Sequence, residues 1–222
     1  MSLREGITFL KQGFKQRSAV GALWPSSKAL CRAMAEPVFA DQPGPLRILE
    51  VGAGVGPVTR EIVSRMRSGD HLDIVELNPA FCGELRGRFG GLVDIDVHEV
   101  SILDYQPPAA YNHIVSGLPL ANFPSDMVEA IYHRYFDLLM PGGTFVMFQY
   151  HFGREALSMF GKGSDRRRIR RVMEYEKQLQ GFEVQHEDIL LNVPPARVRV
   201  RRRPPELTTT GHIHGKVSAA GA

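Results

Sequence analysis

The residues of this sequence that could do chemistry begin with an acid followed by three evenly spaced glycines. Glu50, Gly52, Gly54 and Gly56 form an E-x-G-x-G-x-G pattern directly after an apolar run, and a helix can begin at Pro57 because proline suits a first helical turn. A strand, a glycine turn and a helix together form a nucleotide pocket at the carboxyl end of an α/β sheet. A dinucleotide fingerprint, G-x-G-x-x-G, would need a small residue where Pro57 stands. The carboxylate of Glu50 suits a ligand that carries an ammonium group, and it would repel a pyrophosphate.

A second acid, Glu76, ends the apolar run Ile74-Val75, twenty residues beyond Gly56. In α/β folds an acid at this position binds the two hydroxyl groups of a ribose. The glycine turn, with an acid at the end of each of the first two strands, resembles the class I S-adenosylmethionine-dependent methyltransferases. The resemblance implies S-adenosyl-L-methionine as the cofactor. The alternative is a glycine turn that merely connects a strand to a helix.

The methyl acceptor of such a site is expected beside the run that follows the fourth strand. Methyl transfer is an in-line displacement, which needs an aligned nucleophile and a dry pocket. An amine must also present its lone pair, and desolvation beside a positive sulfur lowers the pKa of its ammonium form. Ser116, Asn122 and the carbonyl groups of this run could hold the remaining N–H groups, so both residues are predicted to be catalytic. Tyr150, at the end of the fifth strand, either contacts the acceptor or packs.

Five segments narrow the resemblance to one family. They are Gly-Ala-x-x-Pro-Ser-Ser at 21–27, Ile-Leu-Glu-Val-Gly at 48–52, Val-Glu-Leu-Asn-Pro-Ala-Phe-Cys at 75–82, Ser-Gly-Leu-Pro-Leu-Ala-Asn-Phe-Pro at 116–124 and Asn-Val-Pro-Pro-Ala-Arg-Val at 192–198. The segment at 116–124 is the most specific. Over about residues 9–203 the chain is similar to the bacterial phospholipid N-methyltransferases, which methylate phosphatidylethanolamine towards phosphatidylcholine.

The resemblance implies a set of cofactor-binding residues. No metal site is expected, because none of the eight histidines forms a His-x-x-x-His or His-Glu-x-x-His pair. The glycine turn would hold the methionine part, Glu76 would take the ribose, and Ser26 and Ser27 would close the site. The family often has Gly-Asp-Ala after the third strand, so here the adenine contact is assigned to Ser101 or to a main-chain group. Where Tyr-Gly-Pro is expected after the fifth strand, this chain has Tyr-His-Phe. The full set is Ser26, Ser27, Glu50, Gly52, Ala53, Gly54, Gly56, Glu76, Leu77, Ser101, Ser116, Gly117 and Leu118.

Two other functions fit parts of the pattern. The ribosomal RNA adenine dimethyltransferases resemble this chain in the first two strands, but they have Asn-Leu-Pro-Tyr/Phe after the fourth. Here Ser116 and Leu120 take the outer positions, Gly117 is inserted, and the first aromatic residue is Phe123. RNA recognition usually needs an aromatic platform for stacking, so this function ranks second. A non-catalytic membrane-surface protein of the same fold ranks third, because the glycine turn and both acids are intact.

These residues require a sheet and helices to bring them together. Strands are predicted at 46–51, 71–76, 92–98, 111–116, 144–150, 182–191 and 196–202, with helices at about 27–35, 57 onwards, 79–89, 125–139 and before 180. This alternation predicts an α/β, Rossmann-like fold: a seven-stranded, mostly parallel sheet with an antiparallel last strand and helices on both faces. We expect N-terminal helices over 1–36 that bind membrane and cover the cofactor, a methyltransferase domain over 37–203 and a flexible tail over 204–222.

Positive charge is clustered although the net charge of the 222 residues is only +3. The clusters lie at 1–32, 166–171 and 197–203, and they indicate a polyanionic partner, either nucleic acid or an anionic membrane. An apolar stripe at 3–17 predicts a helix that lies on a membrane or packs on the core. With the family resemblance, we expect a phospholipid substrate, an anionic membrane surface, no nucleic acid and a monomer.

The compartment expected from the sequence is the cytoplasm, on the inner face of a bacterial membrane. Arg4, Glu5 and Lys11 interrupt any apolar signal at the N-terminus, and no apolar run approaches the roughly 18 residues of a spanning helix. Cys31 and Cys82 have no metal or redox spacing, which fits a reducing compartment.

Overall fold

A computed structural model of the chain describes residues 27–40, 43–92, 94–120, 123–151 and 163–205, and within 163–168 it describes the backbone alone. The helices are α2 (Lys28–Phe39), α3 (Pro57–Val63), α4 (Pro79–Phe89), α5 (Ser125–Leu138) and α7 (Gly163–Gln178), with a 3-10 turn at Leu179–Phe182. The strands are β1 (Arg47–Val51), β2 (His71–Glu76), β3 (Ile95–Glu99), β4 (Tyr111–Ser116), β5 (Leu139–Tyr150), β6 (Glu183–Ile189) and β7 (Ala196–Arg202).

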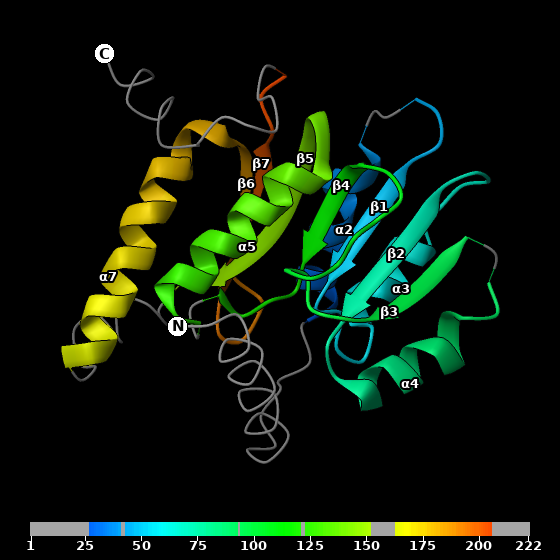
Figure 1. The fold of residues 1–222 in the computed structure, drawn as a ribbon, viewed down its shortest axis with the longest axis horizontal. Helices are drawn as coiled ribbons and strands as arrows, with labels where there is room; N and C mark the ends of the chain where they lie inside the picture. The colour runs from blue at the N-terminus through cyan, green and yellow to red at the C-terminus, as the bar shows by residue number, and fades with distance from the viewer. Residues whose placement is uncertain (1–26, 41–42, 93, 121–122, 152–162, 206–222) are drawn as a thin grey trace.

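The strands of the described residues form one seven-stranded sheet in the order β3-β2-β1-β4-β5-β7-β6. β7 runs antiparallel to both of its neighbours, and the other six strands run in one direction. The order reverses at β1, which pairs with β2 on one side and β4 on the other. In open α/β sheets, ligands bind outside the carboxyl ends of the strands at such a reversal. The predicted fold is therefore confirmed (Figure 1).

Helices cover both faces of the sheet because buried strands point successive side chains to opposite sides. Leu49 and Val51 of β1 pack into a core with α5 and α7. Ile48, between them in the strand, packs into a second core with α2, α3 and α4. In Figure 1, α5 and α7 cover the near face of the sheet, while α2 lies behind it. The two cores hold the strand ends in place and so fix the positions of the loops that follow them.

The largest differences from the sequence prediction are at three element boundaries, and β6 also ends at Ile189, two residues earlier than predicted. α2 continues through Pro37 to Phe39 because Val38 is fully buried in the core. β3 begins at Ile95 because Asp94 has a left-handed backbone conformation, with a φ of 69°. β5 begins at Leu139 and includes the turn that was predicted at 141–143. Leu139 pairs with Tyr111 of β4 across a register shift, and residues 142–143 form backbone hydrogen bonds with Arg203, directly after β7. These bonds to both neighbouring strands extend β5.

The amino ends of the strands carry a buried polar cluster around Asp73, which is 3% exposed. Its carboxylate accepts hydrogen bonds from the Tyr111 hydroxyl (2.8 Å) and from Arg47 Nη2 (3.0 Å), and His98 Nε2 lies 2.7 Å away. Burial tends to raise the pKa of Asp73, but the bonds from His98 and Tyr111 outweigh it and lower that pKa. The cluster therefore links β2 to β1, β3 and β4, away from the strand ends that form the site.

Candidate active site

The glycine turn between β1 and α3 gives the backbone shapes that the pattern requires. Gly52, Gly54 and Gly56 all have positive φ values, of 72°, 58° and 78°. A Cβ atom at Gly52 would lie 2.6 Å from Leu118 Cδ2, so this glycine allows the loop after β4 to approach the turn. A Cβ atom at Gly54 would meet nothing within 4 Å, so this part of the turn borders open space. The turn thus packs on the β4 loop at one position and leaves room at the next.

Glu76, at the end of β2, is bound by the backbone of two loops. Its Oε1 accepts hydrogen bonds from the amides of Leu77 and Asn78, both at 2.8 Å, and its Oε2 accepts one from the amide of Gly54 at 3.0 Å. The side chain is 1% exposed. Since each carboxylate oxygen has two lone-pair sites, Oε2 keeps capacity for another donor. Glu76 therefore joins the glycine turn to the start of α4 and can still accept a hydroxyl group.

Glu50 of β1 points to the face of the sheet that α2 and α3 cover, is 2% exposed, and its Oε2 has no hydrogen-bond partner among the described residues. Burial raises the pKa of Glu50 to about 8, the neighbouring hydroxyl and amide of Thr59 oppose that rise, and the charge of Glu76 adds to it. A buried carboxylate oxygen without a donor is costly, and a cationic ligand would relieve that cost. Its environment therefore suits the ammonium group that the sequence pattern predicts for the ligand.

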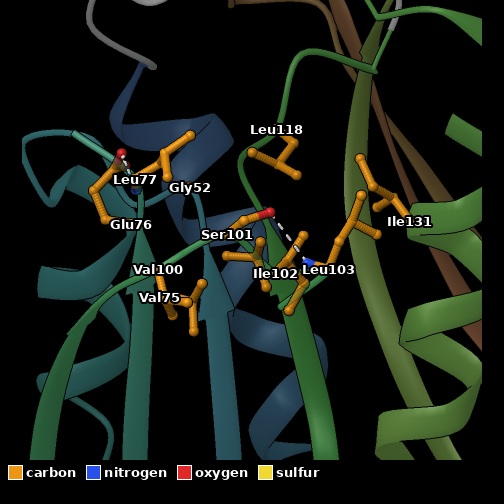
Figure 2. Close-up of a pocket in the computed structure, with 11 residues that line it drawn as sticks. Gly52, Val75, Glu76, Leu77, Val100, Ser101, Ile102, Leu103, Leu118 and Ile131 are labelled. Atoms are coloured by element: carbon orange, nitrogen blue, oxygen red, sulfur yellow. Dashed lines mark hydrogen bonds between the residues drawn. The ribbon is translucent and has the colours of Figure 1, made fainter. Parts of the chain in front are cut away.

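A pocket that opens to solvent lies at the carboxyl ends of β1, β2, β3 and β4. Figure 2 shows Gly52 and Glu76 on one side, Leu118 and Ile131 on the other, and Ser101 between them. Ser101 Oγ accepts a hydrogen bond from the Leu103 amide at 3.3 Å. The walls are mainly apolar, which suits a planar heteroaromatic ring. The lining residues are Val51, Gly52, Val75, Glu76, Leu77, Val100, Ser101, Ile102, Leu103, Leu118 and Ile131.

Five residues of the predicted cofactor set line this pocket: Gly52, Glu76, Leu77, Ser101 and Leu118. The other described members of the set do not line it: Ser27, Glu50, Ala53, Gly54, Gly56, Ser116 and Gly117. A Cβ atom at Gly117 would lie 2.5 Å from the Gly52 carbonyl oxygen, so this glycine brings the ends of β1 and β4 together. Ser26 and Asn122, and the apolar stripe at 3–17, lie outside the described residues.

The predicted catalytic residue Ser116 is buried below the β4 loop. It is 1% exposed, and its Oγ lies 2.8 Å from the Tyr135 hydroxyl of α5 and accepts a weaker bond from the Leu118 amide at 3.4 Å. Burial raises the pKa of Tyr135 well above its usual range, which keeps its hydroxyl neutral. In this arrangement Ser116 fixes the loop that carries Leu118. Its predicted contact with the acceptor stays a prediction.

Tyr150 lies at the end of β5, on the face of the sheet that α2 covers, and His151 follows it. The Tyr150 ring contacts the Phe148 ring edge-on at 5.3 Å between centroids, and both pack against the core on the α2 side. His151 Nε2 lies 2.8 Å from Asp188 Oδ1 on β6. The predicted role of Tyr150 at the acceptor also stays a prediction.

The structure adds a contact between the start of α2 and the loop after β6, to which the sequence analysis gave no role. Asn192 is 3% exposed, and its Oδ1 accepts a hydrogen bond from the Ser27 amide at 3.0 Å. Ser27 Oγ in turn caps α2 by accepting a bond from the Leu30 amide at 3.2 Å. Ser27 and Asn192 belong to two segments that both stood out in the sequence, but only folding shows that these two residues meet.

These features fit S-adenosylmethionine. Glu76 can accept a ribose hydroxyl, the space beside Gly54 leaves room for the ligand, and the apolar walls suit an adenine ring. Glu50 offers a buried acceptor for an ammonium group.

Comparison with known proteins agrees with this geometry. Residues 48–143 match a family described as a methyltransferase domain. Over 149 residues the chain is 30% identical to the ornithine lipid N-methyltransferase of Singulisphaera acidiphila, a match that covers 64% of this chain and 77% of that protein. No helix among the described residues is long and apolar enough to cross a membrane.

Solved structures share the fold at low sequence identity. The 1,6-didemethyltoxoflavin-N1-methyltransferase of Burkholderia thailandensis, solved with S-adenosylhomocysteine, aligns with a TM-score of 0.63 at 17% identity, over 92% of this chain and 91% of that one. The N-methyltransferase NodS of Bradyrhizobium japonicum WM9, also with S-adenosylhomocysteine, aligns with a TM-score of 0.58 at 15% identity, over 80% and 85%. The chain is therefore an S-adenosylmethionine-dependent N-methyltransferase of class I, and it belongs to the family that includes a lipid N-methyltransferase.

Proposed function

We propose that this protein methylates the headgroup amine of phosphatidylethanolamine, and of its mono- and dimethylated forms, towards phosphatidylcholine at a membrane surface. The observation that carries the proposal is the 30% identity to a lipid N-methyltransferase over 149 residues. The segment 116–124 is the most specific part of the resemblance to phospholipid N-methyltransferases, and it is the reason for proposing the phosphatidylethanolamine headgroup.

The bound cofactor supplies an electrophilic methyl group on a positively charged sulfur. The chain must hold a neutral amine against it and exclude water. The apolar wall of Leu118, Ile131 and Leu103 provides the dry surroundings that lower the pKa of an ammonium group. Ser116 holds the β4 loop in place through Tyr135, and we assign the amine N–H groups to Asn122 and to carbonyl groups of that loop.

A second acceptor is favoured by one specific finding. The relative that matches this chain over 77% of its own length is named for ornithine lipid, which also carries a primary amine. Both lipids present an amine at the membrane surface, so one pocket could serve either. RNA is the third acceptor to test, because the fold and the basic clusters are compatible with it.

The proposed location is the cytoplasmic face of the membrane, bound peripherally as a monomer. The apolar stripe at 3–17 and the basic segment at 166–171 are proposed to bind anionic lipids there. Within the segment 166–171, the side chains of Arg170 and Arg171 are exposed to solvent. Their charge would attract anionic lipid headgroups, and salt would weaken that attraction.

The deciding experiment supplies labelled S-adenosylmethionine with three acceptors in parallel: phosphatidylethanolamine vesicles, ornithine lipid vesicles and 16S ribosomal RNA. We expect label in phosphatidylethanolamine. Label in ornithine lipid alone would move the assignment to that lipid, and label in RNA alone would reverse the proposal. Mass spectrometry of the lipid products then counts the methyl groups added.

A further inference from the structure

The turn between β6 and β7 exposes three large apolar side chains. Leu190 is 72% exposed, Leu191 87% and Val193 61%, higher than any other exposed large hydrophobic residue in the described part of the chain. Single exposed apolar residues are common on protein surfaces, but three within four positions form a patch that needs an explanation. We call residues 190–195 the β6–β7 tip.

The β6–β7 tip lies at the same edge of the sheet as the cofactor pocket. β6 runs parallel to β1 and β4, because it pairs antiparallel with β7, which pairs antiparallel with β5. The end of β6 at Ile189 therefore points the same way as the ends of β1 and β4, which border the pocket. In Figure 1 these strand ends share the lower edge of the sheet.

Hydrogen bonds of the buried Asn192 side chain hold the β6–β7 tip in a fixed shape. The buried side chain of Asn192 bonds to the Ser27 amide (3.0 Å) and donates from Nδ2 to the Pro194 carbonyl (2.7 Å). Its own amide donates to the Ile189 carbonyl at 3.4 Å. Asn192 thus ties the tip to the start of α2 while its apolar neighbours point outward. Because this loop is already ordered in the folded protein, binding of a partner requires little further loss of conformational entropy.

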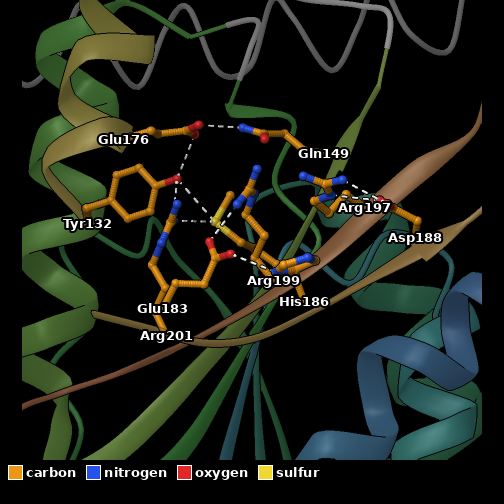
Figure 3. Close-up of polar contacts among 10 residues, drawn as sticks. Tyr132, Gln149, Glu176, Glu183, His186, Asp188, Arg197, Arg199 and Arg201 are labelled. Atoms are coloured by element: carbon orange, nitrogen blue, oxygen red, sulfur yellow. Dashed lines mark hydrogen bonds and ion pairs between the residues drawn. The ribbon is translucent and has the colours of Figure 1, made fainter. Parts of the chain in front are cut away.

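The charge nearest to the tip is compensated. Asp188 forms a two-pronged ion pair with Arg197, at 2.7 and 2.8 Å, and His151 Nε2 lies 2.8 Å from the same carboxylate (Figure 3 shows the Arg197 pair). The Arg197 bond holds the pKa of Asp188 near 2, so this carboxylate stays ionised and paired. An unpaired carboxylate there would oppose contact with an anionic or apolar surface. The pairing removes that obstacle.

We propose that the β6–β7 tip inserts into the membrane interface and holds the pocket edge against the lipid headgroups. The inference rests on the proposed function in one respect, namely that the acceptor is a lipid. Three apolar side chains on a projecting turn are too few for a protein partner, because a stable interface buries about 800 Å² on each side. A bilayer accepts such a turn, since its interior takes isolated apolar side chains without a matching surface.

The test measures how the full chain, saturated with S-adenosylhomocysteine, partitions onto vesicles of phosphatidylethanolamine and phosphatidylglycerol. The variant replaces both leucines, Leu190→Ser with Leu191→Ser. Its matched control is Leu92→Ser, which removes a leucine that is 48% exposed just before β3, at the opposite edge of the sheet. Loss of two apolar side chains from the bilayer should weaken partitioning by about tenfold or more, while the control binds like the parent chain.

A second measurement locates the tip directly. In a Leu191→Trp variant with Trp24→Phe, the tryptophan emission should shift to the blue on vesicles and be quenched by lipids labelled within the acyl region. Unshifted emission on bound protein would overturn the proposal. So would equal partitioning of the double leucine variant and the parent chain, or concentration-dependent self-association that the same variant abolishes.

A third measurement separates this inference from the proposed function. A water-soluble, short-chain phosphatidylethanolamine removes the need for membrane docking. The double leucine variant should methylate it as fast as the parent chain and methylate vesicles at least several-fold more slowly. If the parent chain binds vesicles through the tip but methylates neither form of the lipid, the proposed acceptor is wrong and the docking inference stands.

Discussion

Replacing Glu50 by glutamine should raise the stability of the protein at alkaline pH. Glu50 has an ordinary pKa of 4.5, and burial raises it to about 8 in the folded protein. A carboxyl group whose pKa is raised by folding stabilises the protein fully below its unfolded pKa, and this contribution is lost as the pH rises through the folded pKa. The parent chain should therefore lose stability steadily from slightly acid to slightly alkaline pH.

The size of the effect follows from the two pKa values. Between about pH 6 and pH 9 the ionisation of Glu50 should cost about 2–3 kcal/mol, since each pKa unit is worth about 1.4 kcal/mol. For a chain of this size, that corresponds to a fall in melting temperature of about 5–10 °C. Glu50→Gln keeps the shape of the side chain but cannot ionise, so that pH-dependent cost should be absent from the variant.

The assay is thermal unfolding of the parent chain and of Glu50→Gln across this pH range, without ligand. Saturating S-adenosylhomocysteine should narrow the difference in melting temperature between the two proteins at alkaline pH. The ammonium group of the ligand would stabilise the Glu50 carboxylate, which only the parent chain has. For the same reason Glu50→Gln should bind that ligand more weakly above the pKa of Glu50. Parallel pH curves for the two proteins would refute the idea that burial raises the pKa of Glu50.

Other changes test the rest of the site and the sheet. Glu76→Ala should weaken S-adenosylhomocysteine binding by roughly tenfold to a hundredfold, because charge-assisted bonds worth roughly 1.5–3 kcal/mol are lost; undiminished binding in calorimetry of the folded variant would contradict the ribose assignment. Gly52→Ala should lower the melting temperature and weaken binding together, because its Cβ would lie 2.6 Å from Leu118 Cδ2 and φ is positive; a neutral result in both assays would contradict the packing argument. Asp73→Asn should reduce the extra stability that the parent chain shows above about pH 4, because the lowered pKa of Asp73 gives a contribution that is lost as the pH falls. Identical acid unfolding of the two proteins would show that the Tyr111 and His98 bonds contribute nothing.

The glycine turn, the two acids and the strand pattern were predictable from the sequence because they depend on local backbone requirements. Gly52 and Gly54 need positive φ values, which few other residues accept, and Pro57 begins α3 as expected. The alternation of apolar strands with helices likewise determines a parallel sheet with covered faces. From these features the fold and the cofactor followed.

Side-chain partners far apart in the chain were decided only by the tertiary structure. Ser116 lies beside Tyr135 because α5 packs on β4, and no local pattern says that its hydroxyl is already bonded. The Ser27 amide meets Asn192, 165 positions later, because β6 and β7 return to the start of α2. Burial of Glu50 requires α2 and α3 to cover that face of β1, and solvent exclusion there sets its pKa. Local sequence fixes backbone shape, whereas burial and charge depend on which distant segments pack together.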